Sequence, residues 1–277
     1  MTQAMNKSAI RRIVFACDAA CDIGVAVEEA VALAERWNAA LHGVFMEDEN
    51  LQRLAGLPFG RQVTLSSAVS ETLSAIDLEK ASSAMGAAMR RTLAGAAAQR
   101  GLEWSFGIVR NLSAAAALAE LEGDILIVQG ATRPFSGSWR PRSSLSSLPR
   151  PQARTMLICR QRQGEPGTIV VLPGDPGDER RTLLAGLAMA GPRDELTVLV
   201  RGGKPSRVEA AERIALSLEP APKPGIRIEP APADMPALLR RIDRLKPALI
   251  VLETGEEDAH AIRDMLAGTV CNLLVLR

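Results

Sequence analysis

RRIVFACDAACDIGVAVEEAVALAERWN, residues 11–38, is the stretch that decides the fold, because it joins a short apolar run to a segment of helical spacing. Its opening places five apolar side chains in a row between two arginines and an aspartate, which is typical of a short buried strand. The apolar residues that follow recur at the spacing of one helix face: Val25, Ala26, Ala30, Leu33 and Trp37. The stretch therefore predicts a strand followed by a helix, the repeating unit of α/β proteins.

The same alternation runs through the chain in two cycles. In the first cycle the pattern predicts further strands at 40–48, 102–110, 124–130 and 153–160, and helices at 66–100 and 112–123. The polar segment RQRQGEPG, 160–167, predicts a linker. In the second cycle we expect strands at 168–175, 195–202, 225–232, 247–255 and 271–277, and helices at 178–191, 205–218, 234–246 and 256–268. The repeated order of elements indicates an internal duplication.

Strands that alternate with helices form a parallel sheet with helices on both faces. The expected strands are nearly continuous apolar runs, as required when both faces are covered. We therefore predict two tandem, doubly wound, Rossmann-like domains with five-stranded parallel sheets, over residues 1–162 and 166–277. Ligands of such sheets bind at the carboxyl ends of the strands, where the strand order reverses. The candidate site of each domain lies after its first and fourth strands.

Composition narrows the function classes. Of the 277 residues, 47% are hydrophobic and 23% charged, as in an ordinary folded protein. Aromatic residues are 3% with no tyrosine, which leaves few platforms for stacking bases and disfavours nucleic acid as a partner. A net charge of +1 gives no field directed at DNA or an anionic membrane. No signal peptide or membrane span is evident, so we expect a cytoplasmic protein.

The cysteines and histidines offer little chemistry. Cys17 and Cys21 flank the turn after the first strand as CDAAC. They are either a redox pair or a site for a soft metal ion, or simply small buried residues in a tight turn. The two histidines, His42 and His260, fall in different halves, so we expect no metal site and no catalytic triad. We expect His42 to be a strand residue with a satisfied ring nitrogen.

The sequence resembles the universal stress protein family in its tandem two-domain form. The resemblance covers nearly the whole chain and rests on RRIVFACD, on ALHGVFMED as the second strand, and on DILIVQGA before a Gly- and Ser-containing loop. ARTMLICR and TVCNLLVLR look like the terminal strands of two family domains. The resemblance implies a stress-response or regulatory protein that is not an enzyme and has no catalytic residues.

The resemblance also implies a nucleotide site in the first domain. The family aspartate at the end of the first strand matches Asp18, and the adenine-side region of the second strand begins at Val44. ATP-binding members carry G-x2-G-x9-G-[S/T] after the fourth strand. That spacing falls on Gly130, Arg133, Ser143 and Ser144, with Gly137 as a shifted second glycine.

Two of the three glycines of that pattern are therefore replaced. Arginine or serine restricts the backbone that would approach phosphate oxygens, although arginine also binds phosphate directly. Residues 125–164 contain seven arginines and no Asp or Glu. Three alternatives stay open: a site for ATP or another adenine nucleotide, a site for a different anion, and a basic loop without a specific ligand.

The second domain is expected to bind no nucleotide. Glu253, Glu256, Glu257 and Asp258 follow its fourth strand and would repel phosphates. We expect this domain to be the built-in partner of the first, giving a pseudo-dimer within one chain that can in turn form a homodimer. Two further functions remain open: a ligand-free interaction scaffold and a nucleotide-dependent enzyme of the same fold group.

Overall fold

The computed structural model describes residues 10–18, 21–47, 57, 61–64, 69–72, 74–110, 124–129, 155–159, 167–174, 179–202, 204–218, 225–253, 265, 269 and 271–276. Within these ranges strands and helices alternate as the sequence predicts, and the α/β class is confirmed.

The first half of the chain, before the expected linker, contributes five parallel strands to the main sheet. They are β1 (Arg12–Cys17), β2 (Ala40–Met46), β5 (Trp104–Val109), β6 (Ile125–Gln129) and β7 (Thr155–Cys159). Their order across the sheet is β5-β2-β1-β6-β7, so the strand order reverses between β1 and β6. Ala16 of β1 lies opposite Val128 of β6, which brings the carboxyl ends of these two strands together.

The second half repeats this arrangement. Its strands are β8 (Thr168–Leu172), β9 (Glu195–Arg201), β10 (Ile226–Ala231), β11 (Leu249–Glu253) and β12 (Asn272–Leu276). They lie in the order β10-β9-β8-β11-β12, and the reversal falls between β8 and β11. The order of strands in the second half is therefore the same as in the first.

The two parallel five-stranded units join into one sheet of ten strands. Strand β12 pairs with β7 in antiparallel orientation, with Leu274 opposite Leu157. The sequence predicts two five-stranded sheets rather than one continuous sheet, and the structure differs in pairing the two units edge to edge. The pairing has a simple cause, because the last strand of each unit would otherwise expose a row of unpaired backbone groups.

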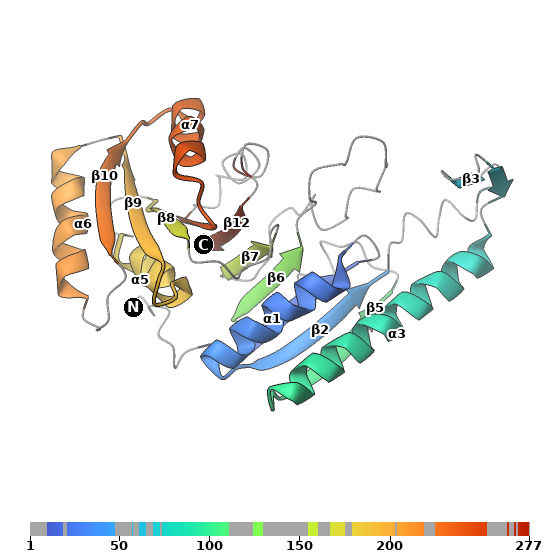
Figure 1. The fold of residues 1–277 in the computed structure, drawn as a ribbon. Helices are drawn as coiled ribbons and strands as arrows, with labels where there is room; N and C mark the ends of the chain where they lie inside the picture. The colour runs from blue at the N-terminus through green and yellow to red at the C-terminus, as the bar shows by residue number, and fades with distance from the viewer. Residues whose placement is uncertain are drawn as a thin grey trace.

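Helices cover both faces of the sheet (Figure 1). Alternate strand residues point to opposite faces, so Ile13 and Phe15 belong to one core and Val14 and Ala16 to the other. The first core packs under α1 (Ile23–Trp37), α3 (Ala75–Gln99), α5 (Glu179–Met189) and α6 (Pro205–Ser217), and the second packs under α7 (Met235–Leu245). Each core contains residues of both halves. The helices expected at 112–123 and 256–268 lie outside the described residues, except for buried Met265.

A polar contact also joins the two halves. Arg36 in the last turn of α1 donates from Nη1 to the carbonyl oxygen of Met189 at 2.7 Å and from Nη2 to that of Ala190. Both carbonyls belong to the carboxyl-terminal end of α5, where helix carbonyls lack intrahelical partners. Arg36 therefore caps a helix of the other half.

The long helix differs from the sequence prediction at its start. We expected it to begin at residue 66, but α3 begins at Ala75, and residues 61–64 and 69–72 form an antiparallel hairpin, β3 and β4. The reason is local: the Ser74 hydroxyl accepts a hydrogen bond from the Asp77 N–H at 3.3 Å and caps the helix there. The helix stops before Gly101 (φ 63°), as predicted. No described helix, α3 included, has the length and apolar character needed to cross a membrane.

Candidate functional site

The candidate site of the first half follows from the strand order. The residues directly after three neighbouring strands lie along one edge of the sheet: Arg110 after β5, Glu47 after β2 and Asp18 after β1. The next strand in the row, β6, ends at Gln129. This edge is the position at which doubly wound sheets bind ligands.

Asp18 is buried, at 4% exposure, and contacts two thiols. Its backbone N–H donates to Cys21 Sγ at 3.3 Å, and the Cys21 thiol donates to Asp18 Oδ1 at 3.4 Å. The Cys17 thiol donates to the Asp18 carbonyl oxygen at 3.4 Å. A backbone bond from Cys21 N to Asp18 O closes the turn at 3.2 Å. The sequence prediction that Asp18 lies at the carboxyl end of the first strand agrees with its position, and its ligand role stays a prediction.

The turn also perturbs the thiol. The pKa of Cys21 is raised, first by its side-chain hydrogen bond with Cys17 and then by burial and the nearby Cys17 and Asp18 charges. The thiol is therefore held in its protonated, hydrogen-bonding form at neutral pH.

Glu47 and Arg110 are site residues that the sequence analysis missed. Arg110 Nε donates to Glu47 Oε1 at 3.1 Å, and the Glu47 side chain is only 4% exposed whereas that of Arg110 is 52% exposed. A carboxylate after β2 and an arginine after β5 could have been noticed, because both positions end strands at the predicted binding edge. The pair places a second carboxylate beside Asp18 and an accessible cation at the end of the row.

The other predicted site residues differ in what can be said of them. Val44 lies opposite Ala16 in β2 and is buried in the core on the α7 face, so its contact with a ligand stays a prediction. The loop residues that match the family motif lie outside the described residues: Gly130, Arg133, Gly137, Ser143 and Ser144.

The equivalent edge of the second half is filled by ion pairs. Glu253, at the end of β11, accepts hydrogen bonds from Arg181 Nη1 at 2.9 Å and from the Thr182 hydroxyl. Both donors lie in the first turns of α5. Glu253 and Thr182 are buried, at 7% and 0% exposure. A carboxylate of the chain itself therefore occupies the position where an anion would meet this helix.

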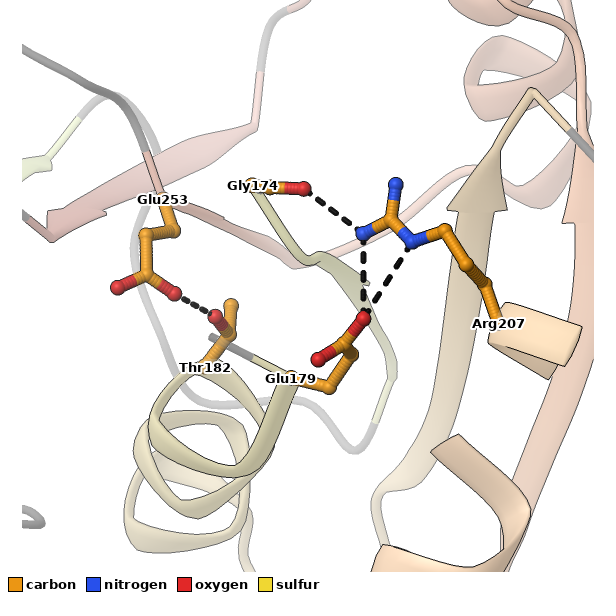
Figure 2. Close-up of polar contacts among 5 residues, drawn as sticks. All are labelled: Gly174, Glu179, Thr182, Arg207 and Glu253. Carbon is orange, nitrogen blue, oxygen red and sulfur yellow. Dashed lines mark hydrogen bonds and ion pairs between the residues drawn. The ribbon is translucent and has the colours of Figure 1, made fainter. Parts of the chain in front are cut away.

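A second ion pair lies next to the first (Figure 2). Arg207 of α6 donates to Glu179 Oε1 at 3.3 Å and to the Gly174 carbonyl oxygen at 2.8 Å. Gly174 follows β8, and a Cβ atom there would lie 3.2 Å from the Glu253 carbonyl oxygen. The glycine thus allows the turn after β8 to pass close to the end of β11, which brings the two ion pairs close to each other.

The histidine prediction can be tested for His42. Its Nδ1 lies 2.7 Å from Ser105 Oγ, so a satisfied ring nitrogen is confirmed. The pKa of His42 is lowered, mainly by burial and secondarily by Arg12. His260 lies outside the described residues. Within the described part of the chain, no three His, Cys, Asp or Glu side chains gather as a metal ion would require.

Comparison with known proteins supports the fold. No family model matches the chain, and no curated protein matches it. A solved structure assigned to the universal stress proteins, from Pseudomonas aeruginosa UCBPP-PA14, is similar with a TM-score of 0.60 and 17% identity, covering 98% of this chain and 94% of the other. A protein of unknown function from Pseudomonas aeruginosa PAO1 is similar with a TM-score of 0.58 and 17% identity, covering 98% and 93%.

A universal stress protein from Archaeoglobus fulgidus DSM 4304 is similar with a TM-score of 0.59 and 9% identity, covering 95% of this chain and 96% of the other. At these identities the likeness establishes the fold. The resemblance to universal stress proteins is thereby confirmed at the level of the fold, over nearly the whole chain.

Proposed function

We propose that this chain is a universal-stress-like regulatory protein whose first half binds an adenine nucleotide or another anion. The proposal is carried by one observation: Asp18 lies buried at the end of β1, where the strand order reverses, with Glu47 at the end of the neighbouring strand. The fold shared with universal stress proteins supports it.

In this proposal the residues of the edge have separate roles. The carboxylates of Asp18 and Glu47 accept hydrogen bonds from the hydroxyl groups of a ribose. The backbone at Gly130, with Gly137, allows phosphates to approach, and Arg133, Ser143 and Ser144 supply charge and hydroxyl donors. Val44 borders the adenine side. We assign no catalytic residue and no metal to the site.

The second half has a structural role in the proposal. A phosphate entering at the end of β11 would have to displace Glu253 from Arg181 and Thr182. It would also approach buried Glu179, which is paired with Arg207. Breaking buried charge pairs is costly, so we expect nucleotide to bind in the first half alone.

Titration calorimetry of the full chain with ATP, ADP, AMP and cyclic nucleotides tests the proposal. We expect heat corresponding to one site per chain with at least one of these ligands. The double variant Arg133→Ala/Ser144→Ala should weaken binding by about tenfold or more, since hydrogen bonds to charged groups contribute about 1.5–3 kcal/mol each. Arg213→Ala, on the exposed side of α6, is the matched control and should bind like the wild type. No heat with any ligand at millimolar concentration would refute nucleotide binding.

A further inference from the structure

The turn after β1 holds two thiols against the same aspartate. Cys17 bonds the Asp18 carbonyl oxygen, and Cys21 bonds both the Asp18 N–H and its carboxylate, at 3.3–3.4 Å. Both thiols therefore contact the same residue, Asp18. The bond from Cys21 N to Asp18 O at 3.2 Å folds the backbone into a turn, so the thiols of two cysteines four positions apart both lie within 3.4 Å of Asp18 oxygen atoms. A disulfide needs two cysteines that already face each other at close range.

We propose that Cys17 and Cys21 are a site of reversible oxidation that closes to an intrachain disulfide at the edge of the candidate ligand site. The chain offers a clear contrast within itself. Cys159 and Cys271 are also reduced and buried, at 4% and 3% exposure, but they lie on opposite faces of the sheet. Cys21 is the one free cysteine of the described residues that is partly exposed.

The reaction is a thiol–disulfide exchange with a small-molecule disulfide such as oxidised glutathione. The accessible Cys21 sulfur loses its proton and attacks one sulfur of the reagent, so a mixed disulfide forms and one glutathione thiolate leaves. The Cys17 sulfur then loses its proton and attacks Cys21 Sγ, which expels the second glutathione thiolate. The two protein protons end on two molecules of reduced glutathione, and two electrons pass from the protein to the reagent.

The size of the closed loop makes the bridge reversible, and the pKa of Cys21 determines how its formation depends on pH. The loop that it closes is short, so it removes little chain entropy and is easily reduced again. The raised pKa of Cys21 keeps the thiolate scarce at neutral pH, so oxidation accelerates as the pH rises.

Oxidation would also change the candidate site. The disulfide removes the proton that Cys21 donates to Asp18 Oδ1. Asp18 then loses one of the contacts that fix its carboxylate, and ligand affinity in the first half should fall. This consequence rests on the proposed function, whereas formation of the disulfide does not.

Peptide mapping of the full chain tests the modification, because trypsin separates the cysteines cleanly. Residues 13–36 contain Cys17 and Cys21, residues 155–160 contain Cys159, and residues 264–277 contain Cys271. After native protein is treated with oxidised glutathione, denatured and alkylated, we expect peptide 13–36 to lose the mass of two hydrogen atoms and to escape alkylation. Dithiothreitol should restore double alkylation, and a Cys21→Ser variant should show no internal bridge. The other two peptides should remain alkylated.

The contrary results are equally clear. The proposal is overturned if peptide 13–36 stays doubly alkylated, if it carries only glutathione, or if Cys159 and Cys271 oxidise as fast. These readings use the wild-type chain, so they hold even where the variant does not fold. Nucleotide titration of the reduced and oxidised protein then separates the two hypotheses. A disulfide without nucleotide binding in either state refutes the proposed function and leaves the oxidation site standing.

Discussion

Replacing Arg36 by methionine should loosen the contact between the two halves. Its guanidinium crosses from α1 of the first half to the end of α5 in the second, where it bonds the carbonyl oxygens of Met189 and Ala190. Burial lowers the pKa of Arg36 and the neighbouring Asp194 partly offsets this, so the charged group is held in a partly desolvated position. Methionine keeps an apolar stem of similar length but removes both donors.

The loss can be worked out from these contacts. A hydrogen bond from a charged group contributes about 1.5–3 kcal/mol, so two such bonds set an upper limit of about 3–6 kcal/mol. Arg36 is only half-buried, and water can reach the carbonyls of α5 once the side chain is gone, which reduces the cost. We expect Arg36→Met to lower the free energy of unfolding by about 2–3 kcal/mol, and the melting temperature by about 2–4 °C per kcal/mol for a chain of this size.

Urea unfolding followed by circular dichroism measures this difference. Arg213→Met is the control, because Arg213 bonds a carbonyl of its own helix on an exposed face of α6. That variant should stay within about 0.5 kcal/mol of the wild type, as surface substitutions usually do. If Arg36→Met is equally neutral, the two hydrogen bonds of Arg36 contribute nothing measurable to stability and the reasoning from this contact is refuted.

Three further predictions concern packing, the second-half network and pH. Glu253→Ala removes the carboxylate that accepts a hydrogen bond from the buried Thr182 hydroxyl. We expect the free energy of unfolding, measured in urea, to fall by about 3–5 kcal/mol. A decrease below about 1 kcal/mol would contradict the importance of this buried pair. Gly43→Ala should destabilise the protein by about 1–3 kcal/mol, because the added Cβ atom would lie 2.5 Å from a leucine methyl. Gly95→Ala should stabilise α3 by about 0.5–1 kcal/mol, because nothing lies within 4 Å of its added Cβ atom. A higher melting temperature for Gly43→Ala than for Gly95→Ala would refute this packing. Because folding lowers the pKa of His42, the unfolded chain takes up a proton at this residue at a higher pH than the folded chain does. The free energy of unfolding should therefore fall as the pH drops below 6.5. His42→Gln should flatten that part of the curve of stability against pH.

Much of the fold could be predicted because the strands are apolar runs separated by segments of helical period. The repeated order of elements was enough to infer the duplication. Edge-to-edge pairing of β7 and β12 was not predictable in the same way, since ARTMLICR and CNLLVLR are compatible with a paired or a covered edge. The start of α3 was missed because residues 66–74 contain alanine, leucine and serine that a helix also tolerates, and the cap at Ser74 decides the boundary.

The site was predictable only where position in the topology determines it. Asp18 ends the first strand, so its place at the reversal of strand order follows from the pattern alone. The pairing of Glu47 with Arg110 could be recognised only in the structure, because these residues are far apart in sequence and become neighbours only when β2 pairs with β5. The carboxylate of Glu253 was predicted to repel phosphate. Its pairing with Arg181 could not be inferred, since nothing in a sequence shows which arginine a buried acid will meet.

In the proposed function only the first half binds a ligand, and the polar contacts of the two halves give a physical reason for this difference. At the reversal of strand order, helix ends and strand ends present polar groups that need partners. The second half meets this need with its own side chains, since Glu253 takes the donors of α5 and Arg207 closes the turn at Gly174. A ligand binding there would form hydrogen bonds only after breaking those that the protein already makes with its own side chains. In the first half the acids Asp18 and Glu47 stand at the same edge, and the arginine-rich stretch of the sequence begins directly after β6. These acids also have partners, since Asp18 bonds the Cys21 thiol and Glu47 bonds the half-exposed Arg110. In the proposed function a ligand would compete there with a thiol and an exposed guanidinium, whereas in the second half it would compete with a buried ion pair.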